Sequence, residues 1–354
     1  NASAFAESRG RVIQDSPMDR RLIDRRDLDF LLFELLDSEA LFARPRFADH
    51  SRETLSAALD TARAIADDHF APHNHRSDEN EPHVVDGRVV LIPEVGAAVR
   101  RVIDAGFLAA PSDYELGGMQ LPFTVHQATG ALFAAANIAT KSYVSLTMAA
   151  ANVIRVFGTP DQKARYMVPM LEGRFFGTMA LTEPQAGSSL SDLRTAAVPA
   201  GDGTYSITGN KIFISAGEND LVENIIHPVL ARIEGAPAGT RGISLFLVPK
   251  IRINDDGSLG EMNDVVCTGI EHKMGIHGNC TCSLALGAKG ACIGTLLGEE
   301  NKGMKAMFQM MNEARIYCGI QGLSLASSSY MNAVNYAKQR IQGANLMTMM
   351  DKNP

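Results

Sequence analysis

The amino-acid sequence predicts an α+β protein of several domains, in which a helical domain precedes a β-barrel or β-sandwich domain and a second helical domain. Apolar residues recur every three or four positions through much of residues 51–176, as they do on amphipathic helices. Residues 177–296 instead hold short β-rich runs between glycine, proline and aspartate turns. The helical period returns in residues 297–354, and residues 1–50 are expected to form an arm and a helix before the first domain.

Helix signals mark the N-terminal part of the chain. A polar arm of residues 1–26 precedes a helix expected at residues 27–43, and Ser51 provides an N-cap for the next helix. Residues 71–87, with their prolines and acidic side chains, predict a loop. Further helices are expected at residues 94–106, 123–136, 140–157 and 161–171.

Strand signals dominate the middle of the chain. β-branched and apolar runs between turns predict strands at residues 204–208, 211–215, 225–233, 242–248 and 281–286. A turn at 298–303 then precedes a long helix from Met304 to about Leu325, and a second helix is expected to reach Gln342. Because the sequence stops soon after, the C-terminal helical domain is expected to be incomplete.

Composition narrows the class of protein. The 354 residues can bury a sizeable core, and a net charge of −7 disfavours nucleic acid or an anionic membrane as the main partner. The five cysteines are irregularly spaced, and the Cys280 and Cys282 pair lacks the second pair that a metal site requires. Four histidines between His69 and His83 are better explained by an exposed polar loop, so no metal is expected. We expect a cytoplasmic protein, because neither a membrane span nor a signal-peptide pattern is evident.

The stretch from Met179 to Leu190 is the first candidate ligand-binding motif. An apolar run ends at Leu181 and passes into a turn at Pro184, followed by Gly187 and two serines. A glycine lets backbone N–H groups approach a ligand closely, and serine adds a hydroxyl. Taken alone, this pattern is also typical of an ordinary turn.

A second stretch, Gly209 to Glu218, strengthens the first. It contains an apolar strand in which Phe213 could cover a flat conjugated ring and Ser215 could donate a hydrogen bond to it. At this spacing the two stretches resemble the paired flavin-binding motifs of the acyl-CoA dehydrogenases, and the match runs from about Ala128 to the end of the chain. The early helix at 27–43 resembles the longer bacterial subfamily, which includes methylthiopropionyl-CoA and broad-range fatty acyl-CoA dehydrogenases.

The resemblance implies an FAD cofactor held by both motifs. It implies that the side chains of Thr182 and Ser215 contact the isoalloxazine and that Phe213 packs on the ring. Ser188 matches the family serine near the flavin pyrophosphate and the pantetheine arm, with a simple turn serine as the alternative. The remaining expected contacts are at Met179, Leu181, Gly187 and Ile214.

The C-terminal helices resemble the part of the family that binds coenzyme A. Arg315 matches the arginine that contacts the CoA portion, whereas Asn312 stands where the family often has an acid, and the alternative is a solvated helix face. Arg340, expected on the second helix, falls at the position of an arginine that reaches the FAD pyrophosphate of a neighbouring subunit. The aromatic residue that usually follows is absent here.

The catalytic base is the weakest match. In most of the family it is a glutamate late in the C-terminal domain, beyond the end of this sequence, and in a minority it immediately precedes the helix arginine. Ala314 occupies that second position, and Glu313 lies one residue away, about 100° around a helix. The base is therefore expected in a segment outside this sequence, with Glu313 as the alternative.

The resemblance implies α,β-dehydrogenation of an acyl-CoA thioester, with the α proton taken by a glutamate, hydride passed to flavin N5 and electrons passed on to an electron-transfer flavoprotein. It also implies a homodimer or homotetramer. The alternatives are an acyl-CoA oxidase and a non-catalytic, DNA-binding flavoprotein of the alkylation-response type, which the acidic composition disfavours. The sequence does not specify the acyl chain.

Overall fold

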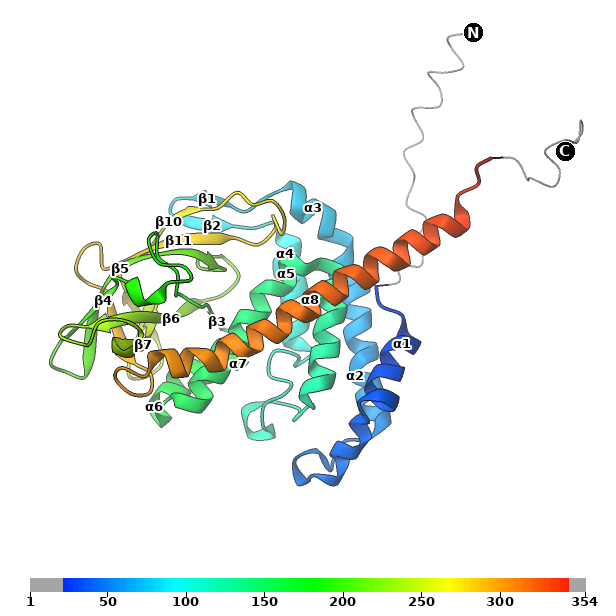
Figure 1. The fold of residues 1–354 in the computed structure, drawn as a ribbon, viewed down its shortest axis with the longest axis horizontal. Helices are drawn as coiled ribbons and strands as arrows, with labels where there is room; N and C mark the ends of the chain where they lie inside the picture. The colour runs from blue at the N-terminus through cyan, green and yellow to red at the C-terminus, as the bar shows by residue number, and fades with distance from the viewer. Residues whose placement is uncertain (1–21, 344–354) are drawn as a thin grey trace, which may run out of the picture.

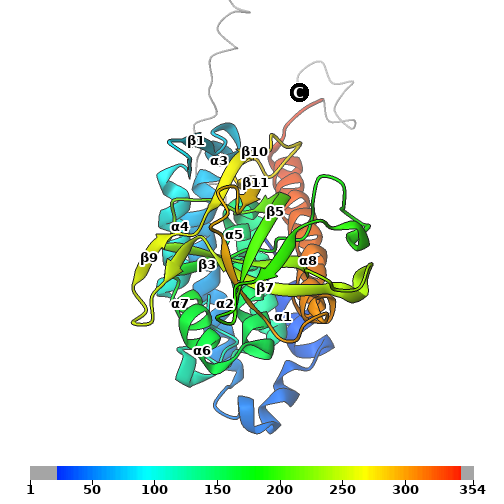
Figure 2. The same cartoon turned by 90° about the vertical axis from the view of Figure 1, so that its left-hand side faces the viewer.

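The computed structural model describes residues 22–343, so most of the expected arm and the last residues of the chain lie outside the described part. Figure 1 shows the N-terminal helices at one side, a β domain at the other, and one long helix crossing both. Figure 2 looks onto the β domain, with the helices behind it. The predicted order of helical, β and helical regions is confirmed.

The expected helix at residues 27–43 is broken into three pieces. It consists of α1 (Arg25–Asp29), the π-helical η2 (Phe30–Leu35) and the 3₁₀-helical η3 (Ser38–Ala43). Asp37, between η2 and η3, has a left-handed φ of 45°, which no continuous right-handed helix can contain. The prediction of one helix here was therefore wrong.

Helices α2 (Arg52–Ile65) and α4 (Pro93–Asp104) form where the sequence predicts them. Ser51 caps α2 through a reciprocal capping box with Thr54, and Leu55, Leu59 and Ala62 face the core. The expected loop at residues 71–87 is instead the short helix α3 (Asn74–Glu79) and a hairpin of β1 (His83–Val85) and β2 (Arg88–Val90). His73, directly before α3, is buried and its Nε2 lies 2.8 Å from Thr140 Oγ1, so this polar segment is packed against α5 rather than exposed as a loop.

The central helix α5 (Phe123–Phe157) bends at Asn137. This residue has φ −160° and ψ 96°, and its side-chain oxygen accepts a hydrogen bond from the Thr140 backbone at 3.1 Å. Asn137 therefore acts as an N-cap for the second half of α5, which explains why two helices were expected from the sequence. The chain then continues through α6 (Pro160–Gln162), η8 (Lys163–Met167) and α7 (Val168–Leu171).

The β domain contains a small closed barrel. The strand β4 (Ala196–Pro199) pairs with both β5 (Thr204–Ser215) and β6 (Asn224–Ile233). Since β12 (Ile293–Leu296) joins β5 to β7 (Ile243–Pro249), and β7 pairs with β6, these strands form a ring. The sheet is extended by β3 (Phe175–Gly177), β10 (Val265–Ile270) and β11 (Thr281–Leu286), while β8 (Ile251–Ile253) and β9 (Leu259–Met262) form a separate hairpin.

The last helix, α8 (Gly303–Gln339), is one continuous rod. Two helices with a break near Leu325 were expected, and this was wrong, because no proline lies between Leu325 and Arg340 and the backbone hydrogen bonds continue. Helix α8 begins against β7 and packs along α5. Arg340 is consequently the C-cap of this same helix rather than part of a second one.

Candidate active site

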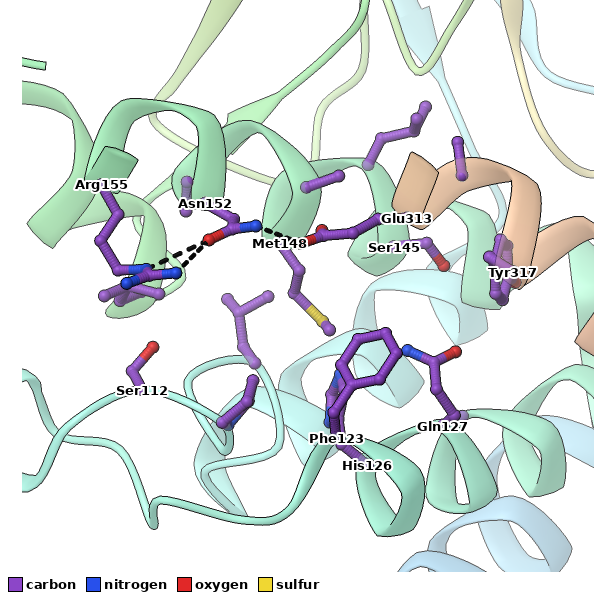
Figure 3. A pocket seen from close by; sticks show the side chains of 18 of the residues that line it. Ser112, Phe123, His126, Gln127, Ser145, Met148, Asn152, Arg155, Glu313 and Tyr317 are labelled. Atoms are coloured by element: carbon purple, nitrogen blue, oxygen red, sulfur yellow. Dashed lines mark hydrogen bonds between the residues drawn. The ribbon is translucent and has the colours of Figure 1, made fainter. Parts of the chain in front are cut away.

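The main cavity lies between α5, α8 and the loops that precede α5, and it has a volume of about 730 Å³. Figure 3 shows α5 residues along one wall, α8 residues on a second, and Phe123, His126 and Gln127 from the first turns of α5 facing them. Met179 and Ser215, one from each predicted flavin motif, also line it. The cavity is therefore bounded by both motifs and by both long helices.

The structure brings the two motifs together as neighbouring strands. Ala180 accepts a hydrogen bond from Leu230 N at 3.2 Å, and the Thr182 carbonyl accepts one from Ile212 N at 2.9 Å. The first motif is thus attached to the sheet between β6 and β5. Thr182 and Ile212 are side by side although they are far apart in the sequence.

A buried ion pair fixes this junction. Lys211 Nζ lies 2.8 Å from Glu183 Oε1, and Glu183 also accepts bonds from Arg194 N at 2.6 Å and from Thr195 N at 3.0 Å. Burial opposes the charge on Glu183, but Lys211 and these hydrogen bonds lower its pKa to about 2. Burial lowers the pKa of Lys211 to about 8 against the opposing effect of Glu183, so both groups are charged at neutral pH. The pair holds the loop that carries Gly187 and Ser188.

Strand β5 changes its register at the second motif. Lys211 pairs with Leu284 and Ile214 with Cys282, so β5 has one more residue than β11 between these points, which defines a β-bulge. Phe213 lies in this bulge with a left-handed φ of 59° and is 58 % exposed, and Ala216 has a φ of 55°. Two non-glycine residues in this sparsely populated region, three positions apart, are typical of a site shaped for a ligand.

The other flavin-motif residues divide by burial. The Leu181 and Ile214 side chains belong to the core, so only their backbones can serve a ligand, as expected. Gly187 and Ser188 lie on an exposed turn outside the cavity lining. Within the described chain, no hydrogen bond engages the Thr182 or Ser215 hydroxyl, which leaves both free for a ligand.

Glu313 is the acidic residue of α8 that reaches the cavity. It accepts a hydrogen bond from Asn152 on α5, and Asn152 in turn accepts one from Arg155 at 2.7 Å (Figure 3). Burial raises the pKa of Glu313 to about 7, against the opposing effects of Asn152 and Arg155. Ala314, which stands at the base position of a minority of the family, also lines the cavity.

The residues predicted to bind CoA, and Arg340, predicted to reach the FAD diphosphate of another subunit, lie outside the cavity lining. Arg315 is exposed, donates to Asn312 Oδ1 at 3.0 Å and lies over the Phe308 ring at 5.3 Å. Arg340 is exposed at the C-terminal end of α8, opposite the end that packs on β7. The structure thus gathers Met179, Ser215 and Glu313, whereas Asn312, Arg315, Arg340 and Ser188 lie elsewhere on its surface.

Several polar residues of the cavity wall were not singled out from the sequence. Lys141 and Ser145 lie on the second half of α5, His126 on its first, and Tyr317 on α8. A lysine with two nearby serines, Ser142 and Ser145, inside an otherwise apolar helical run was the available signal.

Two negative findings concern the described residues. Among residues 22–343, no group of three or more histidine, cysteine, aspartate or glutamate side chains could hold a metal ion. No helix in this part of the chain is long and apolar enough to cross a membrane.

Comparison with family models identifies the class of protein. The acyl-CoA dehydrogenase N-terminal domain matches residues 52–174 and the acyl-CoA dehydrogenase middle domain matches residues 178–287, which together exceed half of the chain. The chain therefore belongs to the acyl-CoA dehydrogenase family, as its motifs predicted.

Individual relatives agree with this assignment. The chain is 38 % identical over 317 residues to 3-methylmercaptopropionyl-CoA dehydrogenase of Ruegeria pomeroyi, covering 90 % of this chain and 53 % of that protein. It is 38 % identical over 333 residues to the broad-specificity linear acyl-CoA dehydrogenase FadE5 of Mycobacterium tuberculosis, covering 92 % and 54 %. The chain thus spans about half the length of these curated relatives, and the predicted resemblance to this subfamily is confirmed.

Solved structures show the same fold. Butyryl-CoA dehydrogenase from Megasphaera elsdenii superposes with a TM-score of 0.67 at 26 % identity, covering 85 % of this chain and 73 % of that one. An acyl-CoA dehydrogenase complexed with FAD from Bacillus anthracis has a TM-score of 0.69 at 23 % identity, covering 85 % and 47 %, and supports the fold alone.

Proposed function

We propose that this chain forms the FAD-binding and acyl-binding part of an acyl-CoA dehydrogenase that introduces an α,β double bond into an acyl-CoA thioester. The observation that carries this proposal is the junction of Thr182 with Ile212, which joins the two motifs next to a cavity lined by Met179 and Ser215. The names of the relatives support the same reaction.

The residues of both motifs fit an FAD. The bulge at Phe213 exposes an aromatic face, and the Thr182 and Ser215 hydroxyls have no partner in the described chain. A Cβ placed on Gly187 would have its nearest neighbour 3.9 Å away, so the backbone there is open to close approach. When bound, FAD supplies the acceptor for the β hydrogen of the substrate. We assign the wall around it to Met179, Leu181, Thr182, Phe213, Ile214 and Ser215, with Gly187 and Ser188 toward its phosphates.

The chain's own residues would position the acyl group. Helix α5 and α8 side chains close the cavity on two sides and exclude water from the reacting carbons. We propose that Ser188, Asn312 and Arg315 contact the CoA portion outside this cavity. In that role they would contribute binding energy rather than chemistry.

The proton acceptor is not supplied at the helix position used by a minority of the family, because Ala314 stands there. Glu313 reaches the cavity, but its carboxylate is directed to Asn152 on α5. We therefore assign Glu313 to the cavity wall and propose that it is not the base.

The remaining assignments concern assembly and context. We propose a cytoplasmic homo-oligomer in which Arg340 of one subunit neutralises the FAD diphosphate of another, with an electron-transfer flavoprotein as electron acceptor. We propose domains at residues 51–176, 177–296 and 297–354, preceded by residues 1–50.

The test uses the full-length protein. We expect it to purify with FAD and to reduce a soluble dye in the presence of acyl-CoA. Electron transfer from the reduced protein to oxygen should be at least about a hundredfold slower than transfer to the dye, which corresponds to a difference of roughly 2.7 kcal/mol in barrier height. Fast reaction with oxygen would indicate an oxidase. A colourless protein that takes up no FAD would refute the proposed function.

A further inference from the structure

One part of the cavity carries an unpaired buried cation. Lys141 is 6 % exposed, donates a hydrogen bond to Ser145 Oγ at 2.6 Å, and its ammonium lies 4.1 Å from the centre of the Tyr317 ring. The side chain crosses Gly130, where an added Cβ would stand 3.5 Å from Lys141 Cε and 3.6 Å from Nζ. Because Gly130 has no side chain, the Lys141 ammonium can lie against its backbone in the cavity wall.

No carboxylate in residues 22–343 forms an ion pair with Lys141. The two acidic residues that line the same cavity are engaged elsewhere, Asp113 by Arg46 and Glu313 by Asn152. A buried ammonium without a counter-ion is costly, and burial lowers the pKa of Lys141 to about 7. A group that restores a counter-charge would be bound favourably here.

Two further buried polar atoms beside Lys141 lack partners within the described chain. These are His126 Nδ1 and Tyr317 Oη, and both residues line the cavity. Figure 3 shows Tyr317 and Ser145 on one side of the cavity and His126 across from them. His126 is neutral because burial, followed by the nearby Lys141 charge, lowers its pKa to about 3. Tyr317, His126 and Lys141 can all donate, so the unmet requirement is for an acceptor.

Along α5, this cluster is separated from the part of the cavity next to the first motif. The Thr147 hydroxyl accepts a hydrogen bond from Gly177 N at 3.1 Å, two residues before the first motif begins, so α5 meets the chain that leads into this motif near Thr147. Lys141 lies six residues earlier, about 9 Å along the helix axis. A chain of several carbons would span that length. Asn152 and Glu313 lie on the other side of this point.

We propose that Lys141, with Tyr317 and His126, binds a carboxylate at the far end of the acyl chain, so that the preferred substrates are ω-carboxyacyl thioesters of CoA. This inference rests on the proposed function of the cavity. The anion supplies the missing counter-charge of Lys141 and the acceptor for Tyr317, and an alkyl chain of equal length supplies neither.

The test compares adipyl-CoA with hexanoyl-CoA, which have the same number of chain carbons, on the full-length FAD-loaded protein at pH 6.5. We expect kcat/KM to be at least about tenfold higher for adipyl-CoA, as charge-assisted hydrogen bonds imply. Lys141→Met should remove that preference, because kcat/KM should fall for adipyl-CoA at least about tenfold more than for hexanoyl-CoA. Lys141→Arg should keep part of it, and Lys338→Met, at an exposed position on α8, should keep all of it.

A second readout separates this inference from the proposed function. Calorimetric binding of the redox-inert 3-thia analogues of both thioesters should show the same dependence on Lys141, and Lys141→Gln replaces Lys141→Met if the latter does not fold. Equal use of both substrates by the wild type, with equal effects of Lys141→Met on each, would overturn the carboxylate site and leave dehydrogenation intact. If neither thioester is oxidised, the proposed function fails, and the calorimetric comparison alone decides whether Lys141 binds the carboxylate.

Discussion

Lys211 Nζ lies 2.8 Å from Glu183 Oε1, and the two side chains are 0 % and 2 % exposed. Lys211 also donates to the carbonyls of Leu181 at 3.0 Å and Leu230 at 2.8 Å. The ammonium thus joins the first motif, the second motif and strand β6 at one point. The position of the loop that carries Gly187 and Ser188 therefore depends on this buried pair of charges.

Replacing one member of this pair should destabilise the fold strongly. Lys211→Met leaves Glu183 buried without its cation, and we expect a loss of about 3–5 kcal/mol in the free energy of unfolding. Urea denaturation followed by circular dichroism measures this. The matched control is Arg174→Ala at the exposed Glu223 pair, where we expect less than about 1 kcal/mol. Equal losses at both sites would contradict the structural role of Lys211.

The same pair predicts an acid-sensitive stability. The pKa of Glu183 falls from 4.5 to about 2 on folding, so the unfolded chain binds more protons between these values and its stabilisation is lost as the pH falls from 4.5 toward 2. Stability should be insensitive to this group above pH 5. The free energy of unfolding, measured across this range, should fall more steeply with decreasing pH for the wild type than for Glu183→Gln. Parallel curves would show that Glu183 does not titrate with folding.

The free hydroxyls of the two motifs predict weaker cofactor binding when removed. Ser215→Ala and Thr182→Ala should each raise the dissociation constant for FAD by about tenfold, because each removes one hydrogen bond to the ligand. Fluorescence titration of the apoprotein measures the constant, and Ser329→Ala, exposed on α8, is the control. Unchanged FAD affinity in both motif variants would place the isoalloxazine elsewhere.

Glu313→Gln should alter the cavity without abolishing the reaction. Loss of a general base lowers rates by about 10²–10⁴-fold, whereas we expect less than tenfold here, because Glu313 is bonded to Asn152. The raised pKa of about 7 means that Glu313 destabilises the fold as the pH rises through 7, so the variant should be the more stable above that pH. Single-turnover flavin reduction measures the rate. A fall of a thousandfold or more would identify Glu313 as the base.

Arg340 predicts a link between assembly and FAD retention. Its exposed position at the end of α8 suits a contact with another subunit. Arg340→Ala should release FAD on dilution while its helical circular dichroism is unchanged. Sizing chromatography with detection at protein and flavin wavelengths tests this, with Lys338→Ala as a nearby control. A monomer that retains all of its FAD would contradict the proposal.

Local patterns in the sequence predicted α2, α4, both motifs and the strands β6, β7 and β11, because alternation, caps and turn residues act over a few positions. The two strands expected at residues 204–208 and 211–215 are the single strand β5, and the hairpin of β8 and β9 was not predicted. Tertiary packing decided the rest. The left-handed turn at Asp37 and the uninterrupted α8 carry no strong local signal. Lys141 and Tyr317 are distant in the sequence and meet only because α5 packs along α8. Both motifs are therefore visible in the sequence, whereas the polar part of the cavity exists only in the folded chain.

Because α5 bends at Asn137, the side chains of its two halves point in different directions. His126 belongs to the half before it, and Lys141 and Ser145 belong to the half after it. Asn137 itself is absent from the cavity lining and bonds instead to Ser77 and Thr140. Because the bend depends on this one buried amide, a substitution at Asn137 would move the His126 half of the cavity wall relative to the Lys141 half without changing any residue of the lining.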